Sequence, residues 1–147
     1  MRRTAALTLT LTFFLTLGLT HAGAARADNV SVGSITADGQ TVRNLSCELE
    51  SSGMLALLQV VGTLAKQKRA LDACTPSGGA FLVKWAWADG KAASVEVTRS
   101  SASAKSACVA KALKLTRSDL TGSCQALVLV GKPDGAAKAA DTLDAKN

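Results

Sequence analysis

The sequence has almost no histidine and no tyrosine. Its single histidine, His21, lies in an N-terminal segment that is expected to be removed, so the mature chain would contain none. Without histidine, neither a Ser-His-Asp triad nor a Cys-His nucleophilic site can be built. There is also no G-x-S-x-G turn and no S-x-x-K pair, and the lone doublet Gly78-Gly79 precedes a strand, which is the wrong order for a phosphate loop. We therefore expect no catalytic residue and no bound cofactor.

The N-terminus has the layout of a secretory signal peptide. Arg2 and Arg3 begin it, residues 7–19 are almost entirely Leu, Thr and Phe, and Ala25-Arg26-Ala27 fits an A-x-A cleavage site. We predict cleavage after Ala27 and a periplasmic or extracellular location. The alternative is an uncleaved anchor, because residues 4–25 carry no charged side chain and are about long enough to cross a bilayer.

Little net charge remains after that cleavage. Removal of 27 of the 147 residues leaves 120, and it takes three of the 17 basic residues but none of the 11 acidic ones. The formal charge falls from +6 to +3, which is too small to predict a nucleic-acid partner. We predict a single domain over residues 28–131 and a flexible tail over residues 132–147, with membrane contact only through an uncleaved N-terminal segment.

The cysteines are few and even in number. Cys47, Cys74, Cys108 and Cys124 all follow the signal segment, and an even count in an exported chain predicts disulfides. There is no C-x-x-C spacing and no histidine to complete a zinc site, so we expect neither a metal centre nor a thioredoxin-like redox pair. Four cysteines allow three pairings.

Alternating apolar and polar residues predict five strands. Asp38-Gly39 and Asp89-Gly90 are turn sequences, and each lies between two such strands. The two hairpins and a last strand that is apolar on both faces are expected at residues 30–35 with 42–49, 80–88 with 93–98, and 125–130.

Two helices complete the expected domain. Apolar residues at three- and four-residue steps predict a helix over residues 54–74, and serines at 100–103 begin a second helix that runs to about Leu115. The element order is then β-β-α-β-β-α-β. This order is typical of a two-layer α+β domain, with an antiparallel sheet and two helices on one face.

The predicted elements favour one disulfide pairing. Both helices carry a cysteine on their apolar side, Cys74 and Cys108, whereas Cys47 and Cys124 lie on or beside strands. We therefore prefer the pairs Cys74–Cys108 and Cys47–Cys124. Each would close a long loop and stabilise the fold by roughly 3–5 kcal/mol.

Trp85 and Trp87 share one strand face with Phe81 and Val83. A face this apolar has to be covered, so we interpret the two tryptophans as core residues. The alternative is an exposed aromatic platform for a sugar or a peptide.

The second half of the chain contains a series of short motifs, which are, in order, Cys74, Gly79-x-Phe81-x-Val83-x-Trp85, Asp89-Gly90-Lys91, Val95-x-Val97, Ser100-Ser101 and Cys108-Val109. This series resembles the AgmX/PglI-type C-terminal domain, a family that is itself similar to the TonB C-terminal domain. The resemblance covers about residues 55–130 and leaves Cys47, Cys124 and the N-terminal hairpin outside it. It implies a Gram-negative cell-envelope protein with a helix–hairpin–helix–strand core. It also implies binding of partner peptides by addition of a strand to a sheet edge.

The function that these observations favour is partner binding without catalysis. We expect a secreted or periplasmic envelope module that binds a protein or peptide partner through an exposed strand edge. The candidate edge residues are Ser94, Glu96 and Thr98, on the polar side of the second hairpin.

Two alternatives stay open. A small carboxylate-based hydrolase would use two acidic side chains as acid and base, drawn from Glu48, Glu50, Asp72, Asp89 and Glu96. Each of these is also explained by a turn, a helix end or an exposed strand face. The other alternative is an inhibitor-type protein that acts on a secreted enzyme.

Overall fold

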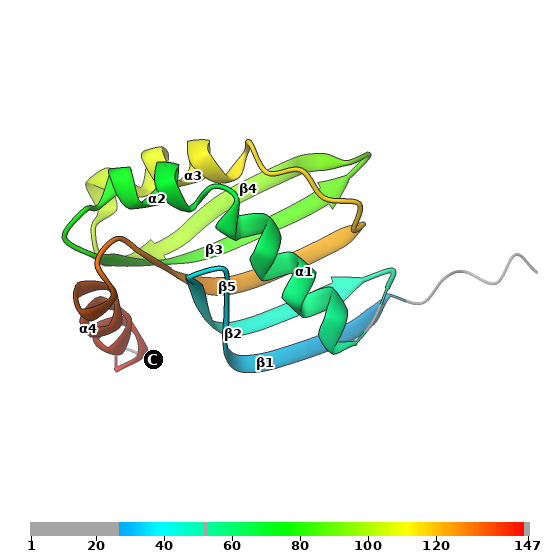
Figure 1. Ribbon diagram of the computed structural model, residues 1–147, viewed down its shortest axis with the longest axis horizontal. Helices are drawn as coiled ribbons and strands as arrows, with labels where there is room; N and C mark the ends of the chain where they lie inside the picture. The colour runs from blue at the N-terminus through cyan, green and yellow to red at the C-terminus, as the bar shows by residue number, and fades with distance from the viewer. Residues whose placement is uncertain (1–26, 52, 146–147) are drawn as a thin grey trace, which may run out of the picture.

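The computed structural model describes residues 27–51 and 53–145, so the predicted signal segment lies outside the described residues, apart from Ala27. Five strands form one sheet in the order β1-β2-β5-β3-β4, and every neighbouring pair is antiparallel. Both predicted hairpins and the last strand are confirmed. The strands are β1 (Asp28–Ala37), β2 (Gln40–Leu49), β3 (Gly79–Ala88), β4 (Lys91–Ser100) and β5 (Gly122–Val130) (Figure 1).

Helices lie on both faces of the sheet. The first three, α1 (Met54–Ala65), α2 (Lys68–Cys74) and α3 (Ser106–Leu113), cover one face, which we call the helix face (Figure 1). The fourth, α4 (Pro133–Asp144), packs on β3 and β5 from the opposite side, which we call the outer face. The α+β class is confirmed. The expected layout of two helices on one face is corrected to three on one face and one on the other.

The periodic segment 54–74 forms two helices where one is predicted. The break lies at Lys66 and Gln67, where the N–H of Gln67 bonds to the carbonyl of Leu64 with the spacing of a 3-10 turn. This break lets α1 lie across β1 and β2 while α2 turns toward α3. Apolar spacing alone fits a continuous helix equally well, so the direction change is a property of the packing and not of the pattern.

Residues 132–147 are predicted to be a flexible tail, but the structure forms α4 there. Pro133 and Asp134 stand in the first turn of α4, where proline and an acidic side chain favour a helix start. Ala140 and Leu143 are buried against the sheet. The physical reason is that β5 is apolar on both faces, so the outer face also needs a cover.

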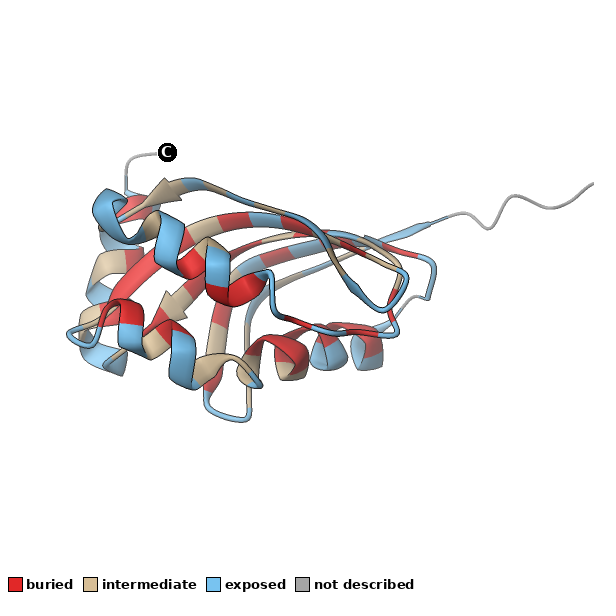
Figure 2. Ribbon diagram, turned by 90° about the horizontal axis from the view of Figure 1, so that it is seen from above, coloured by how far each residue is buried: buried red, intermediate tan, exposed pale blue. Residues whose placement is uncertain are grey.

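The core of the domain lies between the sheet and the three helices of the helix face. Trp85 and Trp87 are 3% and 1% exposed, which confirms the core interpretation and rules out an exposed aromatic platform. Their rings meet edge to face with centroids 5.9 Å apart, a favourable aromatic geometry. The indole N–H of Trp87 donates to Oγ1 of Thr116 at 3.0 Å, which satisfies that buried donor. Figure 2 shows how the buried residues of the helices turn toward the sheet.

Two disulfides join Cys47 to Cys124 and Cys74 to Cys108, the pairing preferred above. The first links directly opposite residues of β2 and β5, and the second links α2 to α3. Their sequence separations of 77 and 34 residues correspond to about 4.5 and about 3.8 kcal/mol in the chain-entropy model. The described part of the chain has no free cysteine. Together the two bridges indicate an oxidising, extracytoplasmic location.

Candidate functional site

The outer face of the sheet is covered on one half and bare on the other. α4 lies over the apolar half, where Ala140 and Leu143 pack with Ala80 and Leu127. The bare half carries mainly hydroxyl, amide and charged side chains. A ligand can therefore bind to the bare polar half of the sheet while α4 and the buried core stay in place.

Three strand residues hold α4 in place. Arg43 of β2 forms an ion pair with Asp141 at 2.6 Å, and Asn44 donates to Asp144 at 3.5 Å. From the other side, Arg99 of β4 donates to the carbonyl of Leu143 at 3.0 Å. Because Asp141 is well exposed, the ion pair contributes little to stability, and it acts mainly to orient the helix.

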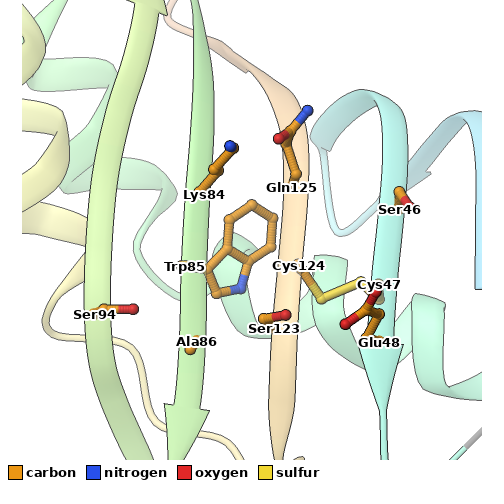
Figure 3. A pocket seen from close by; sticks show the side chains of 10 residues that line it. All are labelled: Ser46, Cys47, Glu48, Lys84, Trp85, Ala86, Ser94, Ser123, Cys124 and Gln125. Atoms are coloured by element: carbon orange, nitrogen blue, oxygen red, sulfur yellow. A yellow bond between two sulfur atoms is a disulfide. The ribbon is translucent and has the colours of Figure 1, made fainter. Parts of the chain in front are cut away.

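The bare half forms a shallow hollow of about 300 Å³, which we call the outer trough. Strand alternation places its lining, because every second residue of β2, β5, β3 and β4 points to this side. Ten residues line it (Figure 3). Seven alternate toward this side, Ser46, Glu48, Lys84, Ala86, Ser94, Ser123 and Gln125, and the other three, Cys47, Trp85 and Cys124, are buried. A second hollow of about 240 Å³ shares Gln125 with the trough and continues to the C-terminal end of α4.

The charged groups of this face are available to a ligand. Within the described residues, Lys84, Glu48 and Glu96 form no ion pair. A cation, an anion, an amide and several hydroxyl groups therefore face solvent in one hollow. Such a set can bind a polar or charged segment, and its chemistry is that of hydrogen bonding and charge pairing.

The predicted binding residues lie on an edge strand. Ser94, Glu96 and Thr98 are all exposed on β4, which ends the sheet. Ser94 lines the outer trough, and Glu96 stands opposite Lys84 in register. Thr98 falls where the register shifts, and its hydroxyl donates to the carbonyl of Leu82 at 3.2 Å. The structure thus brings Ser94 and Glu96 beside the trough, while Thr98 is engaged with the neighbouring strand.

The backbone groups that β4 offers to solvent belong to other residues. The carbonyl of Ala80 accepts a backbone hydrogen bond from the segment after β4, so the even-numbered residues of β3 bond toward β4. Ser94 and Glu96, which stand opposite even-numbered residues, are therefore bonded inward. This leaves the N–H and C=O groups of Val95 and Val97 pointing away from the sheet. Sequence reasoning missed them because it considered side chains only.

Four polar trough residues were also missed: Ser46, Lys84, Ser123 and Gln125. A signal for Lys84 exists in the sequence, because it is the only charged residue in β3 and alternates with the buried aromatic row. The other three are ordinary polar residues whose proximity depends on the strand order. That order places β5 between β2 and β3, which no local pattern reports.

The acidic residues considered for hydrolysis are dispersed. Asp72 accepts the N–H of Gly131 at 2.7 Å and also pairs with a lysine, and Asp89 forms the β3–β4 turn. Glu50 follows β2, outside the trough lining. Glu48 and Glu96 share the outer face, but their strands are three steps apart, or about 14 Å. No group of three or more His, Cys, Asp or Glu side chains in residues 27–51 and 53–145 is placed to hold a metal ion.

Among the helices that the structure describes, none has the length and apolar character needed to cross a membrane. Comparisons of the chain with protein-family models, with curated proteins and with solved structures gave no match.

Proposed function

We propose that this chain is a non-enzymatic module of the periplasm or the extracellular space that binds an extended segment of a protein partner. The segment adds to the β4 edge, and its side chains reach into the outer trough. The observation that carries the proposal is the position of an open edge strand directly beside a bare polar hollow.

The backbone part of this binding uses Val95 and Val97. Residues 94–97 keep a regular register with β3 between two irregular positions, so they present a short straight edge. A partner strand placed there would form hydrogen bonds with the outward N–H and C=O groups of Val95 and Val97. Each such hydrogen bond contributes about 0.5–1.5 kcal/mol net and does not depend on the partner's sequence.

The side chains of the trough supply selectivity. Lys84 lies one strand in from the edge, opposite Glu96, and neither side chain has an ion-pair partner in the described part of the chain. Ser94 and Ala86 are small and leave room for a partner side chain in this part of the trough. We expect the partner segment to carry an acidic side chain that meets Lys84, and polar residues over the hydroxyl groups.

Compartment and resemblance agree with this role. The two disulfides support export, and the layout of residues 1–27 supports release after cleavage at Ala27. The resemblance to the AgmX/PglI-type C-terminal domain supports an envelope protein with a TonB-like core, in which a partner adds a strand to the sheet edge. An inhibitor of a secreted enzyme would be one case of the same binding, with the segment supplied by the enzyme.

The spacing of the outer-face carboxylates favours binding over hydrolysis. Paired-carboxylate hydrolases hold their two carboxyl groups within about 10 Å, with a substrate between them. Glu48 and Glu96 stand on strands about 14 Å apart, and Lys84 and Gln125 lie on the strands between.

Site-specific photocross-linking in the native compartment tests the proposal. A photoreactive residue at Ser94 or Glu96 should capture the same partner, and one at the exposed Lys111 of α3 should not. Val95→Pro removes one outward N–H and should abolish the cross-link, whereas the matched Val95→Ala keeps that N–H and should retain it. A wild-type near-ultraviolet circular dichroism signal from the buried Trp85–Trp87 pair verifies that the proline variant is folded. Equal capture at Lys111, or capture unaffected by Val95→Pro, would overturn the proposal.

A further inference from the structure

The N-terminal half of α1 exposes apolar side chains that the fold does not use. Met54, Leu55 and Leu58 are 59%, 81% and 40% exposed, whereas Leu57 and Val60 of the same helix are fully buried. The whole of α1 lacks a charged residue. Clustered apolar exposure of this kind marks a surface that meets another molecule.

These side chains lie above the outermost strand of the sheet. α1 packs on β1 and β2, at the opposite side of the sheet from β4 (Figure 1). Gln59 and Lys66 line a hollow together with the loop that precedes β5 and with Asp38 of the β1–β2 turn. At about 100° per residue, Met54 and Leu58 lie on the side of α1 opposite to Gln59, at the end of the helix that lies over β1 (Figure 1). Leu55 lies between these two sides and points to solvent.

β1 is the less protected of the two sheet edges. Residues 29–37 include no charged side chain and no proline, whereas β4 carries Lys91, Glu96 and Arg99. Like charges on an edge strand disfavour pairing with the same strand of a second copy, whereas they still allow a partner of complementary charge. β1 therefore offers an edge that can accept a further strand.

In the first half of β1, the outward backbone groups belong to Asn29 and Ser31. The Cα atoms of Cys47 and Cys124 are only 4.1 Å apart, which marks a cross-strand pair without mutual backbone hydrogen bonds. Cys47 therefore bonds to the other side, where Val30 of β1 is its partner. The N–H and C=O groups of Asn29 and Ser31 then point to solvent.

In the second half of β1, the outward groups belong to Ser34 and Thr36. The two-residue turn between β1 and β2 makes Ala37 and Gln40 a hydrogen-bonded pair. Going back along β1 from Ala37, every second residue therefore directs its backbone groups toward β2, and the residues between them direct theirs to solvent. Gly33 has no register partner on β2. At this residue the outward backbone groups change from odd-numbered residues in the first half of β1 to even-numbered residues in the second half. As a result, the outward residues lie symmetrically about the middle of the strand.

We propose that this side of the molecule is the interface of a reversible homodimer. We call it the β1 wall, which comprises β1 together with Met54, Leu55 and Leu58. The two β1 strands run antiparallel about a two-fold axis, with Asn29 opposite Thr36 of the other copy and Ser31 opposite Ser34. The exposed side chains of α1 pack against the α1 helix of the other copy, which places identical surfaces in contact, as a two-fold axis requires.

Symmetry and charge select a second copy as the occupant. Residues 29–37 of β1 carry no charge, so they meet a second copy without like-charge repulsion, and the antiparallel arrangement sets each Asp28 opposite Ala37 of the other copy. Asp28, Glu48 and Glu50 at one end of the β1 wall disfavour an anionic lipid surface. A ten-residue strand about 34 Å long and a helix about 18 Å long give roughly 500 Å² per copy. A standard interface needs about 800 Å² per partner, so we expect a weak dimer that forms only at high concentration.

Sedimentation velocity of the disulfide-bonded chain over roughly 5–500 μM tests this inference. The sedimentation coefficient should rise with concentration from monomer to dimer. Leu58→Glu should weaken the dimer at least tenfold, because it places a charge in an apolar contact. The matched control is Leu115→Glu, at an apolar residue that is 58% exposed outside the β1 wall and should leave the Kd unchanged.

Amide hydrogen exchange of the wild-type chain gives a second measurement that needs no variant. The amides of Asn29, Ser31, Ser34 and Thr36 should exchange more slowly as the concentration rises. A chain that stays monomeric over the whole range would overturn the inference. So would a dimer that Leu58→Glu leaves intact. Monomers that co-sediment with phosphatidylglycerol vesicles, and lose this when Leu58 is changed, would assign the β1 wall to lipid instead.

Discussion

The two faces of the sheet are built from different residues although they share the same strands. On the helix face, β3 contributes large aromatic side chains such as Trp85 and Trp87, which are buried under three helices. On the outer face, the same strand contributes Ala80, Lys84 and Ala86, of which only the first is fully buried. The difference shows that most of the buried core lies on the helix face, so the half of the outer face that α4 leaves bare is available for recognition.

Substitution on the helix face should have the largest effect. Trp87→Ala should lower the free energy of unfolding by about 4 kcal/mol, because it leaves a cavity beside Trp85 and removes the hydrogen bond to Thr116. Urea denaturation under oxidising conditions measures this. Trp87→Phe keeps most of the apolar volume and should cost about half as much. If the free energy of unfolding of the alanine variant fell by less than about 1 kcal/mol, the helix face would not be the main stabilising face of the sheet.

Substitution under α4 should have an intermediate effect. Leu143 is the one large apolar side chain that α4 buries, so Leu143→Ala should lower the free energy of unfolding by about 2 kcal/mol. The amides of α4 should exchange faster while those of β3 stay protected. Thr142→Ala, at the exposed neighbouring position, is the matched control and should change neither. Unchanged exchange in α4 of the Leu143 variant would contradict the packing described for the outer face.

Substitution in the outer trough should change binding and leave stability alone. Lys84 is exposed and forms no ion pair in the described residues, so Lys84→Ala should alter the free energy of unfolding by less than about 0.5 kcal/mol. The same variant should weaken partner binding about tenfold, through loss of a charge-assisted hydrogen bond. Calorimetric titration with the captured partner measures the affinity. Equal affinity for Lys84→Ala and wild type would place recognition away from the trough.

The parts of the fold that could be predicted are those whose signals are local. The alternation around Trp85 and the Asp89-Gly90 turn define the second hairpin, because a period of two and a tight turn each need only neighbouring residues. The cysteine pairing followed from element type, since Cys74 and Cys108 lie on helices. The exposed position of Ser94 on β4 followed from the same alternation.

The parts that could not be predicted depend on contacts between distant residues. α4 escaped notice because its apolar side is mostly alanine, and only the two-sided apolar character of β5 pointed to a second cover. The outer trough escaped because Ser46 and Lys84 become neighbours only when β5 inserts between their strands. The outward direction of the N–H and C=O groups of Val95 depends on how β4 pairs with β3, so the residue types in the sequence do not indicate it.

Backbone amide exchange at the β4 edge tests the proposed binding site most directly. The disulfide-bonded chain is compared alone and saturated with the partner segment captured through Ser94. We predict that the amides of Val95 and Val97 exchange at least about tenfold more slowly in the complex, because the added strand accepts their hydrogen bonds, while those of α3 do not change. Unchanged exchange at Val95 and Val97 in a saturated complex would contradict the account.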